Sequence, residues 1–284
     1  MLKDLIALTK PRLNFLVLLS ALAGYGMGGS GGSAFDLSKF CEFAAALFLL
    51  AGASSALNMW MEREFDARMK RTAQRPLAAG RVSPRLGLLF GLALTALSLL
   101  WLAWRVNALT AWIGGATWAS YLFVYTPLKR VSSISTWVGA VPGALPPVMG
   151  WTAATGSMSE AALALFLVLF FWQIPHFLAI AVMYEDEYKA AGFKVMPFEQ
   201  GISATGRQMV LYALVLVPVT LWIHRLGLAG QLYFYAAIAL GLAYAGVAVY
   251  AAGFSGRDRA RRLLLASVFY LPLLFTVMLA DRVS

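Results

Sequence analysis

The sequence predicts an all-α, polytopic membrane protein folded as a single bundle of nine transmembrane helices. Of its 284 residues, 61% are hydrophobic and 13% are charged, whereas soluble domains are about half apolar and about a quarter charged. Apolar segments of about 17 to 25 residues recur along the whole chain, the length at which an α-helix crosses about 30 Å of hydrocarbon. Most connections between them are short, so neighbouring helices are expected to pack antiparallel in one domain spanning residues 1–284.

The nine spans follow from hydropathy and from helix-breaking residues. Pro11 stands where the first helix would begin, a position that tolerates proline. Three prolines and three glycines between Trp137 and Trp151 predict a distorted fifth span. The first residues lack a signal-peptide pattern, so we expect the first span to be retained. The expected spans lie near residues 12–29, 40–61, 86–104, 108–126, 134–153, 160–184, 208–224, 231–252 and 263–280.

The formal net charge of +10 is mostly a topology signal. When the ends of the nine spans are assigned alternately to two sides, 19 of the 23 Lys and Arg residues fall on one side. The positive-inside rule then places the N-terminus in the cytoplasm and the C-terminus outside. We therefore expect the lipid bilayer as the environment and no nucleic-acid partner. Cys41 is the only cysteine, which excludes an internal disulfide and a thiolate metal cluster.

The strongest chemical pattern lies at the cytoplasmic end of the second span. Four polar residues recur at every fourth position, on one face of a helix: Asn58, Glu62, Asp66 and Lys70. A solvated helix end with surface ion pairs is the alternative, but Asn58 lies a turn deeper, where an unpaired polar group is costly and usually functional. Carboxylate and amide oxygens suit Mg²⁺, which binds through one or two carboxylates together with a substrate phosphate. We predict a Mg²⁺–diphosphate site with Asn58, Glu62 and Asp66 as catalytic residues and metal ligands.

Basic residues on the same side of the membrane are predicted to bind the diphosphate. Three of them, Lys70, Arg71 and Arg75, directly follow the acidic face of the second span. Two more end the fourth span in the segment YTPLKR, and one lies in the segment TKPR before the first span. Guanidinium groups make forked contacts with phosphate oxygens. For the pair in YTPLKR, a simple topology anchor is an equal alternative. The expected diphosphate ligands are Lys10, Lys70, Arg71, Arg75, Lys129 and Arg130.

A polar stripe runs along the sixth span and the loop after it. On a helical wheel, five polar side chains fall within about 120° of one another, provided that Pro175 does not rotate one half of the helix against the other. They are Gln173, His176, Tyr184, Glu187 and Tyr188. His176 is either a hydrogen-bonded packing residue or an axial ligand of haem iron. An aromatic slot for a porphyrin would be lined by Phe171, Trp172 and Phe177. His224 lies at an outer loop and is expected to be structural.

These segments resemble the UbiA-type intramembrane prenyltransferases, and within them the branch that farnesylates haem. In two places the sequence departs from the usual pattern: Glu62 stands where the family has Asp, and Glu187 replaces an Asp before Tyr188. The match rests on TKPR at 9–12, the Asn58/Glu62/Asp66 array with KRTAQRP at 70–76, YTPLKR at 125–130, PGALPPVMGW at 142–151, WQIPHF at 172–177 and EYKAAGFKVMP at 187–197.

The resemblance implies a reaction and its participants. Farnesyl diphosphate would ionise with Mg²⁺ as cofactor, its allylic carbon would alkylate a vinyl group of haem B, and water would complete the side chain of haem O. Haem B and farnesyl diphosphate would be the substrates of a multi-pass protein of the bacterial cytoplasmic (inner) membrane, with a haem-handling partner enzyme. The expected haem-binding residues are His176, Gln173, Tyr184 and Glu187.

The apolar bundle would also have to shield an allylic carbocation from water. By residue type, the aromatic rings of Trp118, Tyr121 and Tyr125 are expected to stabilise that cation.

Two alternative functions stay open. One is a UbiA-type enzyme that prenylates an aromatic or quinone-precursor acceptor, and the other is a membrane transporter, against which the clustering of charges at one membrane surface counts.

Overall fold

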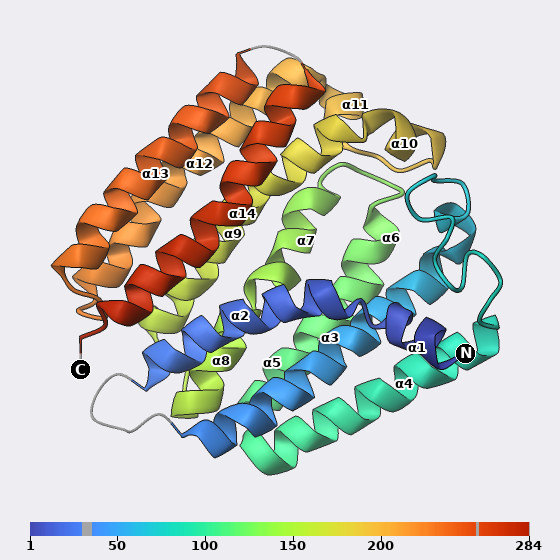
Figure 1. Cartoon of the computed structure of the whole chain (residues 1–284), viewed down its shortest axis with the longest axis horizontal. Coiled ribbons are helices and arrows are strands. Elements are labelled where there is room, and N and C mark those ends of the chain that lie inside the picture. The colour runs from blue at the N-terminus through green and yellow to red at the C-terminus, as the bar shows by residue number, and fades with distance from the viewer. Residues whose placement is uncertain (30–35, 254–255, 284) are drawn as a thin grey trace.

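The computed structural model describes residues 1–29, 36–253 and 256–283. Within these ranges every regular element is a helix, and the helices pack side by side in one bundle (Figure 1). In chain order they are α1 (Leu2–Leu8), α2 (Pro11–Gly28), α3 (Leu37–Asp66), α4 (Pro84–Trp101), the π-helix η1 (Leu102–Val106), α5 (Ala108–Ala119), the π-helix η2 (Ser120–Tyr125), α6 (Thr126–Leu128), α7 (Ser135–Ala144), α8 (Pro146–Thr155), α9 (Glu160–Met183), α10 (Glu185–Ala190), α11 (Met196–Gln200), α12 (Ile202–Arg225), α13 (Gln231–Ala252) and α14 (Arg257–Ala280).

The helix lengths confirm a multi-pass membrane protein. Among the described residues, six helices are long and apolar enough to cross a membrane: α3, α4 continued by η1, α9, α12, α13 and α14. Helices α1 and α2 meet at a bend of 42° and together make a seventh candidate. Neither of the expected spans 108–126 and 134–153 is among the seven. The latter is divided between α7 and α8, which begins at Pro146, because proline cannot donate the helical hydrogen bond. The nine-span count stays a prediction.

The first half of the bundle depends on a close approach between α2 and α8. A Cβ atom added at Gly24 would lie 1.9 Å from the carbonyl oxygen of Pro147, and one added at Gly150 would lie 2.0 Å from that of Ala21. Both neighbours are backbone atoms, so no side chain can move aside to make room. Small residues allow membrane helices to pack backbone to backbone in this way.

Replacing Gly150 with alanine is therefore expected to destabilise the protein. Overpacking a close helix contact costs roughly 1–3 kcal/mol, and the thermal unfolding temperature in detergent should fall accordingly. Gly246→Ala is the matched control, because Gly246 also lies inside a helix but a Cβ there meets nothing within 4 Å. Alanine is the better helix former, so the control should unfold at the same or a higher temperature. Equal unfolding temperatures for the two variants would contradict the close contact.

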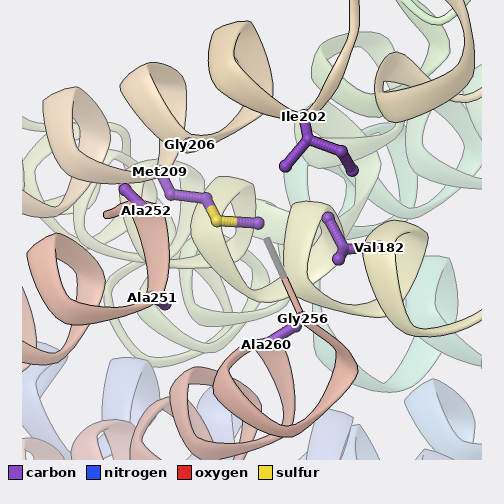
Figure 2. Close-up of a pocket in the computed structure, with 8 residues that line it drawn as sticks. All are labelled: Val182, Ile202, Gly206, Met209, Ala251, Ala252, Gly256 and Ala260. Atoms are coloured by element: carbon purple, nitrogen blue, oxygen red, sulfur yellow. The ribbon is translucent and has the colours of Figure 1, made fainter. Parts of the chain in front are cut away.

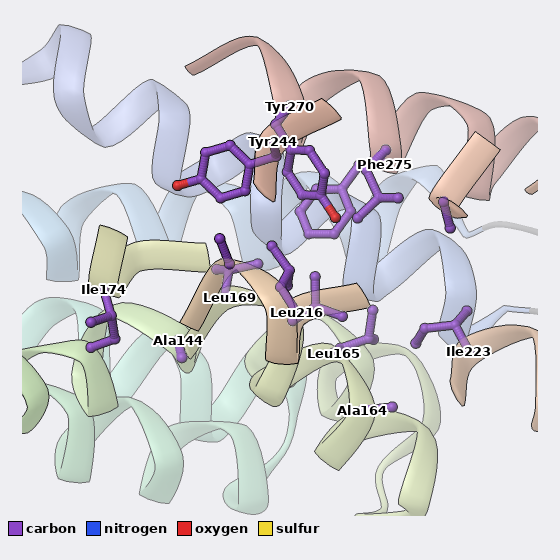
Figure 3. Packing of buried hydrophobic residues seen from close by; sticks show 14 of the residues in the cluster. Ala144, Ala164, Leu165, Leu169, Ile174, Leu216, Ile223, Tyr244, Tyr270 and Phe275 are labelled. Atoms are coloured by element: carbon purple, nitrogen blue, oxygen red, sulfur yellow. The ribbon is translucent and has the colours of Figure 1, made fainter. Parts of the chain in front are cut away.

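The second half of the bundle, α9 with α12, α13 and α14, holds the largest apolar core. Figure 3 shows Leu165 and Leu169 of α9 facing Leu216 of α12, with Tyr244 and Tyr270 beside them. The two tyrosine rings stack with centroids 5.1 Å apart. At the end where α9, α12, α13 and α14 meet, a gap of about 10 Å³ remains (Figure 2), which is at the lower limit for a single water molecule. This half is thus a close-packed support for α9.

Two charged segments far apart in sequence meet at one end of the bundle. The segment 67–83 after α3 and the helices α10 and α11 lie together at the upper right of Figure 1, close to α1. The backbone N–H of Lys194 donates to the carbonyl oxygen of Lys129 at 2.9 Å, and the rings of Phe65 and Phe193 are 5.8 Å apart. The end of α14 lies at the opposite end of the bundle (Figure 1). The expected metal ligands and the expected diphosphate ligands Arg75 and Lys129 are therefore brought together at the end that carries the two charged segments.

Candidate functional site

The amide and the two carboxylates of α3 lie on one buried face, as their spacing predicts. The Asn58 Nδ2 group donates to Glu62 Oε2 and to Thr126 Oγ1, both at 3.1 Å. Asn58, Glu62 and Asp66 are each 3% exposed, so all three polar groups are removed from bulk solvent. Both hydrogens of the Asn58 amide are therefore used within the protein.

Each carboxylate forms an ion pair with a cation from another segment. Lys129 Nζ lies 2.6 Å from Glu62 Oε1. Arg75 Nη1 lies 2.7 Å and 2.8 Å from the two oxygens of Asp66. Removing one partner of such a buried pair leaves an uncompensated charge, which is strongly unfavourable. The structure thus brings Arg75 and Lys129, two of the expected diphosphate ligands, directly onto the expected metal ligands.

Lys129 stays charged despite its burial. Burial lowers the pKa of the ammonium, but the neighbouring Tyr125 and Glu62 outweigh this and hold the pKa above its ordinary value. The Nζ atom also lies 4.9 Å from the centroid of the Tyr125 ring and 5.5 Å from that of Phe193. Lys129 is therefore a fixed positive charge held between a carboxylate and two aromatic faces.

Lys10 approaches the same group from the break between α1 and α2. Its backbone has φ 46° and ψ 59°, and it is the one non-glycine residue with positive φ among those described. Such a conformation costs of order 1–3 kcal/mol and is concentrated at functional sites. Burial, together with the charges of Arg75 and Lys129, lowers the pKa of Lys10 to about 7. An anion bound here would favour the charged form and draw a proton onto Lys10.

The remaining expected diphosphate ligands are less central. Arg130 donates to the carbonyl oxygen of Met61 at 3.0 Å, and its guanidinium lies 4.0 Å from the Phe65 ring centroid, so it braces α3. Arg71 is exposed and donates to the hydroxyl of Tyr188 at 3.2 Å. Lys70 is exposed, and no ion pair joins it to any described residue. The expected face does not extend to Lys70 because α3 ends at Asp66.

The polar stripe of the sixth span is divided among different neighbours. Gln173 is buried and donates from Nε2 to the carbonyl oxygens of Ala140 and Leu169 at 3.1 and 3.0 Å, which ties α9 to α7. His176 instead contacts α14, where its Nδ1 lies 2.7 Å from Ser267 Oγ. The haem-binding roles of these two residues stay predictions, and the structure gives Gln173 a structural hydrogen-bonding role as well.

The last members of the stripe lie with the charged segments. Helix α9 ends at Met183, and Tyr184 stands at the break before α10. The Arg71 guanidinium lies 4.9 Å from the centroid of the Tyr184 ring. The Glu187 Oε2 atom is buried and has no hydrogen-bond partner among the described residues. Tyr184 is therefore grouped with Arg71, and Glu187 lies in the short helix α10 that follows, at the end of the bundle that carries the charged segments.

Two of the three expected carbocation-stabilising rings lie close to the ion pairs. Tyr121 and Tyr125 contact each other with centroids 5.4 Å apart, and Gly139 of α7 leaves space for Tyr125, since a Cβ there would be 2.4 Å from the ring. Trp118 packs edge-on against Phe123 instead. His224 Nδ1 donates to the carbonyl oxygen of Ala229 at 2.8 Å, in agreement with its expected structural role.

Two residues of the site were not predicted from the sequence. Thr126 accepts a hydrogen bond from Asn58 and lies within the segment YTPLKR, beside the Lys and Arg that were predicted to bind the diphosphate. Ser267 holds His176 but stands alone in an apolar run. Only the position of Thr126 beside a charged motif could have been used as a signal.

Comparisons with known proteins identify the family of this chain. The model of the UbiA prenyltransferase family matches residues 17–278. The chain belongs to the UbiA prenyltransferase family. A relative from Solibacter usitatus, named protoheme IX farnesyltransferase, is 44% identical and is aligned over 99% of both chains. The ring of cations around two acidic residues thus belongs to a prenyltransferase.

Solved structures show the same fold at low sequence identity. A structure of a digeranylgeranylglyceryl phosphate synthase superposes with a TM-score of 0.83 at 13% identity, covering 99% of this chain and 98% of that one. A UbiA homolog from Archaeoglobus fulgidus bound to GPP and Mg²⁺ gives a TM-score of 0.70 at 19% identity, covering 97% and 99%. The UbiA prenyltransferase bundle described here is therefore the fold that these enzymes share.

Proposed function

We propose that this UbiA prenyltransferase transfers the farnesyl group of farnesyl diphosphate to a vinyl group of haem B, with addition of water, to give haem O. The observation that carries the prenyl-transfer half is the pair of buried carboxylates, Glu62 and Asp66, ringed by Lys10, Arg75 and Lys129. The acceptor rests on the relatives at up to 47% identity that are named protoheme IX farnesyltransferase. It is further supported by a histidine held inside the bundle.

The donor set at the end of α3 fits Mg²⁺ bound jointly with a diphosphate. Its oxygens come from two carboxylates and one amide, the ligands that a hard cation prefers. No group of three His, Cys, Asp or Glu side chains forms a site among the described residues, so phosphate oxygens would have to complete the coordination. Asn58, Glu62 and Asp66 would hold the ion, which supplies charge neutralisation for the departing diphosphate. The A. fulgidus homolog bound to GPP and Mg²⁺ supports this.

Substrate binding can exchange the existing ion pairs without leaving a buried charge unpaired. The cations Arg75 and Lys129, now paired with Asp66 and Glu62, would turn to the phosphate oxygens. Lys10 adds a third cation, in a backbone conformation that is already strained. These side chains stabilise the negative charge that develops as the C1–O bond breaks and diphosphate leaves with the electron pair.

The remaining steps take place in the dry part of the bundle. The allylic cation lies near the faces of Tyr121 and Tyr125, which disperse its charge. The vinyl group of haem B supplies the electron pair for the new carbon–carbon bond. Water then adds to the carbon beside the porphyrin ring and releases a proton to solvent. The apolar walls keep water away until the carbon–carbon bond has formed.

Further features of the proposal concern topology and partners. We infer one domain of nine spans, with the N-terminus and the ion-pair site at the cytoplasmic side of a bacterial inner membrane. The charged segments at one end of the bundle and the end of α14 at the other (Figure 1) support this orientation through the positive-inside rule. A haem-handling enzyme would receive the product, because haem O is too apolar to diffuse freely through water.

The reaction itself tests the proposed function. Purified protein is incubated with haem B, farnesyl diphosphate and Mg²⁺, and the extracted haem is weighed by mass spectrometry. We expect the mass of haem B plus one farnesyl group and one hydroxyl group. Unchanged haem together with farnesylation of a hydroxybenzoic acid acceptor would instead establish the quinone-precursor alternative. A metal-chelated sample provides the control for the Mg²⁺ requirement.

His176 is expected to be a haem ligand. The His176→Ala variant should lose haem B binding by absorbance titration, with affinity weakened by about 10-fold or more, while farnesyl diphosphate binding is retained. His224→Ala is the matched control, since these are the two histidines of the chain and His224 bonds only to a nearby carbonyl. An unchanged haem spectrum in His176→Ala would refute the role.

A further inference from the structure

The His176 ring is held by a hydrogen-bond chain that crosses from α9 to α14. His176 Nδ1 lies 2.7 Å from Ser267 Oγ, and the Ser267 hydroxyl donates to the carbonyl oxygen of Leu264 at 2.6 Å. Ser267 is fully buried. A buried hydroxyl has one hydrogen to donate, and here that hydrogen is used within α14.

This chain determines the tautomer of the histidine. Because the Ser267 hydrogen points to Leu264, the serine oxygen can only accept from the ring, so Nδ1 carries the proton. The lone pair of a neutral imidazole then lies on Nε2. Within the described part of the chain no hydrogen bond to Nε2 is found, and Nε2 is not among the wholly buried atoms without a partner. The nitrogen that can bind a metal is thus not used in the packing of the bundle.

The plane of the ring is fixed by aromatic neighbours. Trp172 stacks on His176 with centroids 5.1 Å apart and planes at 28°, and Phe177 meets it edge-on at 5.6 Å. Trp172 is itself anchored, since its Nε1–H donates to the backbone carbonyl oxygen of Ser267 at 2.9 Å. One residue of α14 therefore holds both rings, through its side chain and its backbone.

We propose that Ser267 is a positioning residue that fixes His176 in the Nδ1–H tautomer and presents Nε2 to the iron of the haem substrate. The inference rests on the proposed function. Histidines that bind metals usually donate their other ring N–H to an oxygen, which sets the ring orientation and raises the basicity of the ligand. Ser267 supplies that oxygen from a helix that the sequence pattern did not connect with haem.

The test measures haem binding in the purified full-length protein without turnover. Haem B is titrated into the wild type, Ser267→Ala, Ser267→Thr and Ser98→Ala, and the ferrous complexes are examined by resonance Raman spectroscopy. Ser98 is the matched control, because it is also fully buried and donates to the carbonyl oxygen three residues earlier, but no histidine contacts it. Farnesyl diphosphate binding and the unfolding temperature are measured for each variant.

We expect Ser267→Ala to weaken haem binding about 10- to 100-fold, the usual effect of removing a partner of a metal-bound histidine. The iron–histidine stretching frequency should fall, because the ligand loses its hydrogen bond. Ser267→Thr keeps the hydroxyl and should keep the higher frequency. Ser98→Ala should match the wild type, and all variants should bind farnesyl diphosphate normally.

The inference fails if Ser267→Ala retains both the wild-type haem affinity and the wild-type iron–histidine frequency. It also fails if that variant loses farnesyl diphosphate binding together with haem binding, since the serine would then support the fold in general. These outcomes differ from a failure of the proposed function, in which the wild type would not convert haem B. They also differ from a failure of the histidine assignment, in which His176→Ala would bind haem like the wild type.

Discussion

The Asp66→Asn variant is expected to lose Mg²⁺-dependent release of diphosphate, with kcat lower by at least about 100-fold. Asn has nearly the shape of Asp, and Arg75, which loses its charged partner, is 25% exposed and can be solvated, so the fold around α3 should be kept. What is lost is the negative charge that would hold the metal ion and that now pairs with Arg75 through both oxygens at 2.7 and 2.8 Å. The measurement is pyrophosphate release from farnesyl diphosphate in the presence of haem B and Mg²⁺.

The control for this variant lies at the other end of the same helix. Asp36 caps the start of α3 by accepting from the backbone N–H of Lys39 at 2.9 Å. Asn is as good a helix cap as Asp, so Asp36→Asn should keep full activity and stability. Full activity in Asp66→Asn would refute the assignment of Asp66 as a metal ligand.

The Lys129→Met variant is expected to lose both activity and stability. Lys129 pairs with Glu62 at 2.6 Å, and Glu62 is 3% exposed. Removing the ammonium leaves a buried carboxylate unpaired, at a cost of about 3 kcal/mol or more in the free energy of unfolding. It also removes a cation from the expected diphosphate site, so prenyl transfer should fall by about 100-fold.

A double variant separates these two effects. Adding Glu62→Gln to Lys129→Met removes the unpaired carboxylate, so the unfolding temperature should return most of the way to that of the wild type while activity stays lost. Lys194→Met is the control, because its ion pair with Glu199 is 3.9 Å long and the lysine is 42% exposed; surface pairs of this kind contribute about 1 kcal/mol or less. If the double variant unfolded at the same temperature as Lys129→Met, the Glu62–Lys129 pair would not be the cause of the destabilisation.

The part of the site on α3 could be predicted because it depends on local geometry. Any α-helix places residues four apart on one face, so Asn58, Glu62 and Asp66 share a face wherever α3 packs. The same spacing gave the wrong position for Lys70. The helix ends at Asp66, whose carbonyl oxygen accepts from the hydroxyl of Thr72. The chain then turns back and brings Arg75, rather than Lys70, onto the carboxylate.

The part of the site on α9 could not be predicted in the same way. A helical wheel grouped Gln173 with His176, whose side chains are about 60° apart on the helix, but in the packed bundle different helices stand on the two sides of that angle. Gln173 reaches α7, and His176 reaches Ser267 on α14. Which helix stands next to each side chain is a property of the packed bundle, and it changes a shared stripe into two separate contacts.

The sequence by itself determined that the protein is a helical membrane bundle, where its charges gather, and which polar residues of α3 share a face. These properties arise from composition and from the periodicity of a single helix. Only the tertiary structure decided which cation pairs with which carboxylate, that Lys10 adopts a strained conformation beside them, and that Ser267 orients His176. Such contacts join residues up to 91 positions apart, and no local pattern specifies them because they depend on how the helices pack.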